Sequence, residues 1–135
     1  MNLQDFLNTH LVDELTDEVA ISPRFVDSNG KPLLFKIKAM TGQEFDEIRK
    51  ACTTLKKGRK VEFDSQRFNL KVIINHTAEP NFKDAASIKQ VGVTTPEEYV
   101  QRVLLAGEIA TLAQKISELS GFDVDMSDLV EEAKN

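Results

Sequence analysis

The feature that most constrains the fold is a short run of alternating side chains that follows a turn signal. Asn29-Gly30 closes an Asp-Ser-Asn-Gly segment, and this pair tolerates the positive φ angles of tight hairpin turns. Beyond it, Phe35, Ile37 and Ala39 alternate with two lysines. A period of two is typical of a strand with one buried face. We therefore expect a β-hairpin over residues 17–40.

Most of the remaining chain shows the three- and four-residue spacing of amphipathic helices. Apolar side chains recur in this way over residues 1–16 and through much of residues 41–121. Thr41 and Glu44 can form a capping box, and Thr95-Pro96 combines a cap with proline at the first helical position. The predicted class is α+β, with the N-terminal hairpin, or a small antiparallel sheet, packed on a bundle of about four or five helices.

The length predicts one domain over residues 1–135. It divides into an amphipathic N-terminal helix (1–16), the hairpin (17–40), a helical part (41–121) and an acidic C-terminal tail (122–135). The predicted core consists of the side chains that point inward on these elements: Phe25, Phe35, Ile37, Phe45, Ile48, Phe68, Val72, Leu104, Ile109, Leu112 and Ile116.

Residue types that could catalyse a reaction or bind a metal are few and scattered. The imidazole and thiol groups belong to His10, His76 and Cys52, without the paired spacing of a zinc site. The six glycines are isolated, so no phosphate-binding loop is present, and no Gly-x-Ser-x-Gly motif occurs. We therefore predict a protein that binds another protein, with no enzymatic activity, metal or cofactor.

The N-terminal sequence also bears on the compartment. Residues 1–23 contain five acids and neither Lys nor Arg, so the basic start of a secretory signal is missing. Uninterrupted apolar runs are too short to span a membrane. We expect a cytoplasmic protein without a membrane partner.

A basic segment interrupts this acidic chain. Residues 49–60 contain six positive charges and no acid, whereas the whole chain carries −5, so the remainder carries −11. As an alternative, Lys56, Lys57, Arg59 and Lys60 could contact nucleic-acid phosphates, which would indicate a structural or nucleic-acid-associated protein. We favour a solvated helix end and loop, because the segment lacks an aromatic for base stacking and its surroundings repel a polyanion.

Several short strings cover nearly the whole chain in a consistent order and spacing. They are Glu14-Leu15-Thr16, Ser22 with Arg24-Phe25, Gly30-Lys31-Pro32, Glu47-Ile48-Arg49-Lys50, Leu104-Leu105 with Gly107-Glu108, Glu118-Leu119 with Gly121-Phe122, and Glu131-Glu132-Ala133-Lys134-Asn135. Together they resemble the XkdN-like family of phage tail assembly chaperones. Ala106 stands where the family's Leu-Leu-Pro-Gly-Glu has proline, so we expect the two C-terminal helices to be less sharply separated here.

The resemblance implies a chaperone from a phage or prophage of Gram-positive bacteria. Such chaperones bind the tape-measure protein, the long helical rod that sets tail length. They keep it soluble until tube subunits assemble around it, and they are absent from the mature virion. Many are also made in a longer form by ribosomal frameshifting, and the codons of Ala133-Lys134-Asn135 could permit such a slip. A frameshifted longer form of the chain itself is therefore a second expected partner.

Two apolar surfaces are candidates for contact with the partner. One is the N-terminal helix, with Phe6, Leu7 and Leu11, since a terminal helix can dock on a partner as well as on its own domain. The other is the apolar edge formed by Leu104, Leu105 and Gly107. Gly107 also marks a predicted break or tight packing point between helices.

Overall fold

The structure is a computed structural model that describes residues 1–122, so the predicted acidic tail lies, from residue 123 on, outside the described residues. The helices are α1 (Leu3–Thr9), the 3₁₀ helix η1 (Val12–Glu14), α2 (Gly42–Ala51), α3 (Ser65–His76), α4 (Ala85–Gln90), α5 (Pro96–Val103) and α6 (Ala106–Leu119). The strands are β1 (Thr16–Val19), β2 (Phe35–Lys38), β3 (Thr53–Lys56), β4 (Lys60–Phe63) and β5 (Thr77–Glu79).

A three-stranded antiparallel sheet with the order β1-β2-β5 forms one layer of the molecule. In the central strand β2, Phe35 and Ile37 are buried and the two lysines are exposed, as the alternation predicted. A long connection, residues 20–34, joins β1 to β2, and the Asn-Gly turn lies at its tip. An isolated antiparallel bridge between Val26 and Pro32 joins the two sides of this loop. The hairpin and the α+β class are therefore confirmed.

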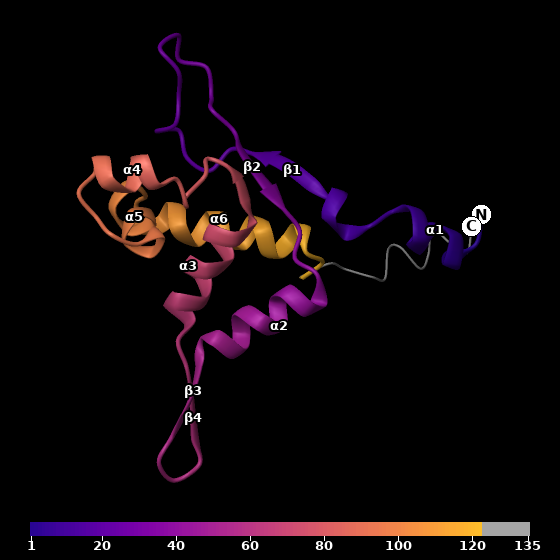
Figure 1. Cartoon of the computed structure of the whole chain (residues 1–135). Coiled ribbons are helices and arrows are strands. Elements are labelled where there is room, and N and C mark those ends of the chain that lie inside the picture. The colour runs from indigo at the N-terminus through magenta and orange to yellow at the C-terminus, as the bar shows by residue number, and fades with distance from the viewer. Residues whose placement is uncertain (123–135) are drawn as a thin grey trace.

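Helix α3 lies at the centre of the helical layer, where it packs against α2, α5 and α6 (Figure 1). Its Val72 and Ile73 are almost fully buried, as are Leu112 and Ile116 of α6. Of the predicted core, seven side chains are buried: Phe35, Ile37, Ile48, Val72, Leu104, Leu112 and Ile116. The other four are partly buried and pack against that cluster: Phe25, Phe45, Phe68 and Ile109.

The predicted helix starts are confirmed, because each depends on contacts within one turn. Thr41 Oγ1 accepts a hydrogen bond from the Glu44 amide at 3.1 Å, and Glu44 Oε1 accepts one from the Thr41 amide at 2.9 Å. The bond from the Thr41 amide also lowers the pKa of Glu44, since it stabilises the ionised carboxylate. At α5, Thr95 Oγ1 accepts a hydrogen bond from the Glu98 amide at 3.2 Å, and Pro96 is the first residue of the helix.

Loss of the Thr41 cap should have a measurable effect on stability. We expect Thr41→Ala to lower the free energy of unfolding by about 1 kcal/mol, because the Glu44 amide loses its side-chain acceptor. Urea denaturation measures this change. Thr54→Ala is the matched control, since Thr54 lies exposed on β3 and should cost less than about 0.5 kcal/mol. Equal losses in both variants would contradict the capping argument.

Three sequence-based expectations differ from the structure. Helix α1 ends at Thr9, well short of residue 16, and contains no buried residue, so no packing extends it. Much of the basic segment forms the β3–β4 hairpin, in which cross-strand hydrogen bonds replace the predicted loop. Helices α5 and α6 are clearly separated by Leu104 and Leu105, whose backbones are extended.

Candidate partner-binding groove

An apolar hollow of the described residues lies beside the sheet and is lined in part by the residue 20–34 loop. Its volume is about 380 Å³. The lining comes from the loop and β2 (Phe25, Leu33, Leu34, Phe35), from the end of β5 onward (Glu79, Pro80, Phe82) and from the α5 region (Tyr99, Val103, Leu104). We call this hollow the groove. Glu79 is its one charged lining residue, so the groove suits an apolar ligand.

Two leucines on the groove's loop side and one at the α5–α6 junction are exposed. Leu33 is 52% and Leu34 47% exposed, and Leu105, next to the lining residue Leu104, is 60% exposed. By contrast, Phe82 and Phe35 are buried within the walls and form part of the core. The groove therefore combines a buried aromatic interior with exposed apolar side chains that a partner could cover.

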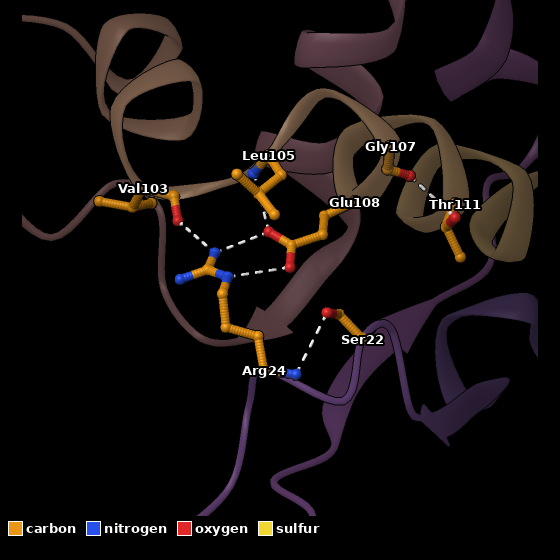
Figure 2. Close-up of polar contacts among 7 residues, drawn as sticks. All are labelled: Ser22, Arg24, Val103, Leu105, Gly107, Glu108 and Thr111. Carbon is orange, nitrogen blue, oxygen red and sulfur yellow. Dashed lines mark hydrogen bonds and ion pairs between the residues drawn. The ribbon is translucent and has the colours of Figure 1, made fainter.

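An ion pair fastens the loop to the junction between α5 and α6 (Figure 2). Arg24 donates from Nη2 to Glu108 Oε1 at 2.6 Å and from Nε to Glu108 Oε2 at 3.0 Å. Its Nη2 also donates to the Val103 carbonyl at 2.9 Å. The guanidinium lies 4.6 Å from the centre of the Phe25 ring, which lines the groove. The pair therefore joins residues that are 84 positions apart in the sequence, and it positions one wall of the groove.

Burial and pairing make Glu108 electrostatically distinct from the other carboxylates. Its side chain is 5% exposed, whereas that of Arg24 is 46% exposed. The hydrogen bonds from Arg24 lower the pKa of Glu108 to about 2, against an opposing effect of desolvation. Glu108 is therefore ionised at neutral pH despite its burial, and it requires Arg24 as its partner.

Glu108 also explains why the α5–α6 break needs no proline. Its Oε1 accepts a hydrogen bond from the Leu105 amide at 2.7 Å, which satisfies a free donor at the start of α6. Gly107 lies in the first turn of α6, and a Cβ added there would meet no atom within 4 Å. The expectation that Gly107 marks the break or a tight packing point is therefore wrong.

The structure places the two predicted contact surfaces differently. Leu104 is buried and lines the groove, so of that predicted edge only Leu105 and Gly107 are exposed to a partner. Phe6 and Leu7 lie exposed on α1, and Leu11, just before η1, is 58% exposed. Figure 1 shows α1 apart from the body of the molecule, so the two surfaces do not form one site.

The four basic residues of the alternative site lie on the β3–β4 hairpin. Lys56 ends β3 and pairs with Glu62, Lys57 and Arg59 flank Gly58 at the tip, and Lys60 begins β4. The hairpin extends from the body at the end of α2 (Figure 1). These side chains are exposed and distant from the groove, so they form a separate surface.

Several groove residues were missed by sequence reasoning. Leu33-Leu34 follows the turn with no alternation, and this run of two leucines was the available signal for an apolar surface. Phe82 lies in a short connection between β5 and α4, where no periodicity marks a buried residue. Its burial arises only because α5 packs beside it, with the Tyr99 ring centre 6.1 Å from that of Phe82.

The groups considered for catalysis or metal binding are not assembled into a site within residues 1–122. His76 is buried, and desolvation lowers its pKa, which favours the neutral imidazole. Burial likewise raises the pKa of the Cys52 thiol. No three His, Cys, Asp or Glu side chains among the described residues are grouped to hold a metal ion. In the same part of the chain, no helix is long and apolar enough to cross a membrane.

Comparisons with known proteins agree with the sequence resemblance. Residues 3–134 match the family described as phage XkdN-like tail assembly chaperone protein. The protein YqbN of Bacillus subtilis (strain 168) is 39% identical over 139 residues, which cover 99% of this chain and 93% of YqbN. The phage-like element PBSX protein XkdN of the same organism is 36% identical and covers 99% of this chain and 94% of its own.

A solved structure is similar over most of the fold. The crystal structure of the protein YqbN aligns with a TM-score of 0.73 and 35% sequence identity. The alignment covers 91% of this chain and 98% of the YqbN chain.

Proposed function

Since the chain belongs to the XkdN-like family of phage tail assembly chaperones, we propose that its groove binds an apolar helical segment of the tape-measure protein. The observation that carries this proposal is the group of exposed leucines beside an apolar hollow, namely Leu33, Leu34 and Leu105. Binding would cover apolar stripes of the rod that otherwise aggregate, and so keep it soluble until tube subunits assemble.

The size of the groove suits a helix that docks a few side chains. A hollow of about 380 Å³ lies within the range of small binding sites and accommodates two or three large apolar side chains. Neighbouring turns of an amphipathic helix present such side chains on one face, which is the helix-in-groove mode of recognition. Leu34 and Leu105 would then contact the flanks of the helix.

The mode of binding also has to permit release. A groove of this size, with exposed rather than fully enclosed leucines, supports a modest interface that growing tube subunits can displace. The loop that carries Leu33 and Leu34 is attached to the helices through Arg24 and Glu108, so its position is defined before the partner binds. This preorganisation lowers the entropic cost of binding.

The remaining parts of the proposal concern where and how the protein acts. The chaperone acts in the host cytoplasm, is absent from the mature virion and has no catalytic role. A frameshifted longer form of the chain is a proposed second partner, and the residues at which it would diverge, 133–135, lie outside the described residues.

The groove proposal can be tested by co-expression with the tape-measure protein of the same gene cluster. We expect the wild type to keep the rod soluble and to co-purify with it. Leu34→Asp combined with Leu105→Asp should weaken the complex about tenfold or more, because carboxylates would be desolvated in an apolar contact. Titration by biolayer interferometry measures the affinity.

Ala110→Asp is the matched control, since Ala110 is an exposed apolar residue of α6 that does not line the groove. It should bind as the wild type does, and all variants should keep the wild-type melting temperature. Wild-type affinity of the double leucine variant would contradict the groove as the binding site. A rod that is equally insoluble with and without the wild type, with no complex isolated, would refute the chaperone assignment itself.

A further inference from the structure

The β3–β4 hairpin has an apolar face that nothing in the described chain covers. In its register Leu55 pairs with Val61 and Thr53 with Phe63, so these side chains lie on the same face of the ribbon. Leu55 is 76%, Val61 65% and Phe63 47% exposed. Only the base contacts the body, through the Phe63 and Phe68 rings at 5.4 Å.

The composition of the hairpin indicates the chemistry of a binding partner. A two-stranded hairpin is marginally stable alone in water, and exposed apolar side chains on a strand favour association. Lys57 and Arg59 flank Gly58 at the tip, and Lys56 and Lys60 lie on the opposite face of the ribbon, where Glu62, the single acid of residues 53–63, pairs with Lys56. The hairpin therefore suits a partner that packs an apolar side chain against Leu55 and Val61 and places acidic side chains near the basic tip.

The N-terminal arm of the chain, residues 1–14, precedes strand β1 and has the complementary character. On α1, Leu3, Phe6 and Leu7 share one face and Asp5 lies on the opposite side. The arm contains three acids, Asp5, Asp13 and Glu14, and no Lys or Arg, and neither α1 nor η1 has a buried residue. It is thus an amphipathic segment that no other part of the described chain buries, and its charge is opposite to that of the hairpin.

We infer that the β3–β4 hairpin of one copy binds the N-terminal arm of a second copy of this chain. Figure 1 places α1 and the hairpin at different ends of the molecule, so neither can cover the other within the copy shown. A second copy supplies both the apolar face and the opposite charge. Because each copy carries one hairpin and one arm, the contact either closes reciprocally into a dimer or continues head to tail.

A charge-swap experiment tests this inference in the full-length protein. The hairpin variant carries Lys57→Glu and Lys60→Glu, and the arm variant carries Asp13→Lys and Glu14→Lys. Sedimentation velocity between about 1 and 500 µM should show concentration-dependent association of the wild type, weakened by added salt. Each variant alone should associate at least about tenfold more weakly, because like charges then face each other.

An equimolar mixture of the two variants should restore association, since each reversed segment meets an opposite charge on the other copy. Two controls change equal numbers of charges elsewhere: Lys31→Glu with Lys89→Glu, and Asp125→Lys with Asp128→Lys. Both should associate as the wild type does. Circular dichroism melts verify that every variant is folded.

Three outcomes would overturn the inference. The first is a wild type that stays monomeric throughout the concentration range. The second is association that the hairpin and arm variants do not alter. The third is a mixture of the two variants that associates no better than each alone. In any of these cases, loss of DNA binding by the hairpin variant would instead assign the hairpin to nucleic acid.

Discussion

Replacing Glu108 with alanine is expected to lower the free energy of unfolding by about 2–3 kcal/mol at pH 7. The substitution removes a buried carboxylate that holds Arg24 and accepts the Leu105 amide. Breaking a buried pair costs about 3–5 kcal/mol. We expect the lower value because Arg24 is 46% exposed and can be solvated by water. Urea denaturation measures the loss.

Glu118→Ala provides the matched control in the same helix. Glu118 is exposed, and it pairs at 3.9 Å with Lys115, whose side chain is 42% exposed. Such surface pairs contribute little, so this variant should lose less than about 1 kcal/mol. If Glu108→Ala is no more destabilising than Glu118→Ala, the pair does not anchor the loop.

The same pair predicts a particular dependence of stability on pH. The pKa of Glu108 is about 2 in the folded protein, below its ordinary value of 4.5. The folded state therefore binds this proton more weakly than the unfolded state, and stability falls as the pH decreases. The contribution of Glu108 is fully present above about pH 4.5 and is lost progressively toward pH 2.

Glu108→Gln should flatten that part of the acid denaturation profile, because glutamine does not titrate. Glu44, whose pKa is also lowered, would continue to supply part of the acid dependence in this variant. An acid profile parallel to that of the wild type would show that Glu108 is not the group responsible.

Truncation of Phe82 should have the largest effect on stability. Phe82 is 1% exposed and is the largest of the almost fully buried side chains in the described residues. Phe82→Ala removes its contact area and leaves a cavity beneath the groove, which we expect to cost about 3–5 kcal/mol. Phe82→Leu keeps most of the volume and should cost less than about 2 kcal/mol.

Phe122→Ala is the control for loss of an aromatic ring. Phe122 is 43% exposed and contacts Phe45 with ring centres 5.1 Å apart, so its truncation should cost about 1 kcal/mol. Thermal or urea denaturation of both variants measures the difference. Similar losses from Phe82 and Phe122 would contradict the placement of Phe82 in the core.

Features that depend on neighbouring residues were predictable from the sequence. The Thr41 and Thr95 caps, the alternation in β2 and the Asn29-Gly30 turn were all read correctly, because each involves residues within a few positions. The partner-contact residues were less accessible to this reasoning. Leu104 and Leu105 are adjacent and equally apolar, yet one is buried and the other 60% exposed.

The pairing partners of short strands could not be predicted in the same way. Strand β5 has only three residues, directly after α3, and it pairs with β2 some forty residues earlier in the chain. Too few residues are present for a periodicity, so only the contact with β2 identifies the strand. The apolar residues of β3 and β4 are exposed and form no buried face. The basic residues between these two short strands also interrupt the alternation, so the pattern did not predict a hairpin.

The sequence by itself determined the helix starts, the hairpin turn and the α+β class, since short-range sterics and hydrogen bonds specify them. Tertiary structure alone decided the groove and its anchor. Arg24 meets Glu108 from 84 positions away, and Phe82 is buried only because the end of β5 and α5 meet there. Such long-range contacts form only when packing compensates for the entropic cost of closing long loops. A local sequence pattern therefore cannot predict them.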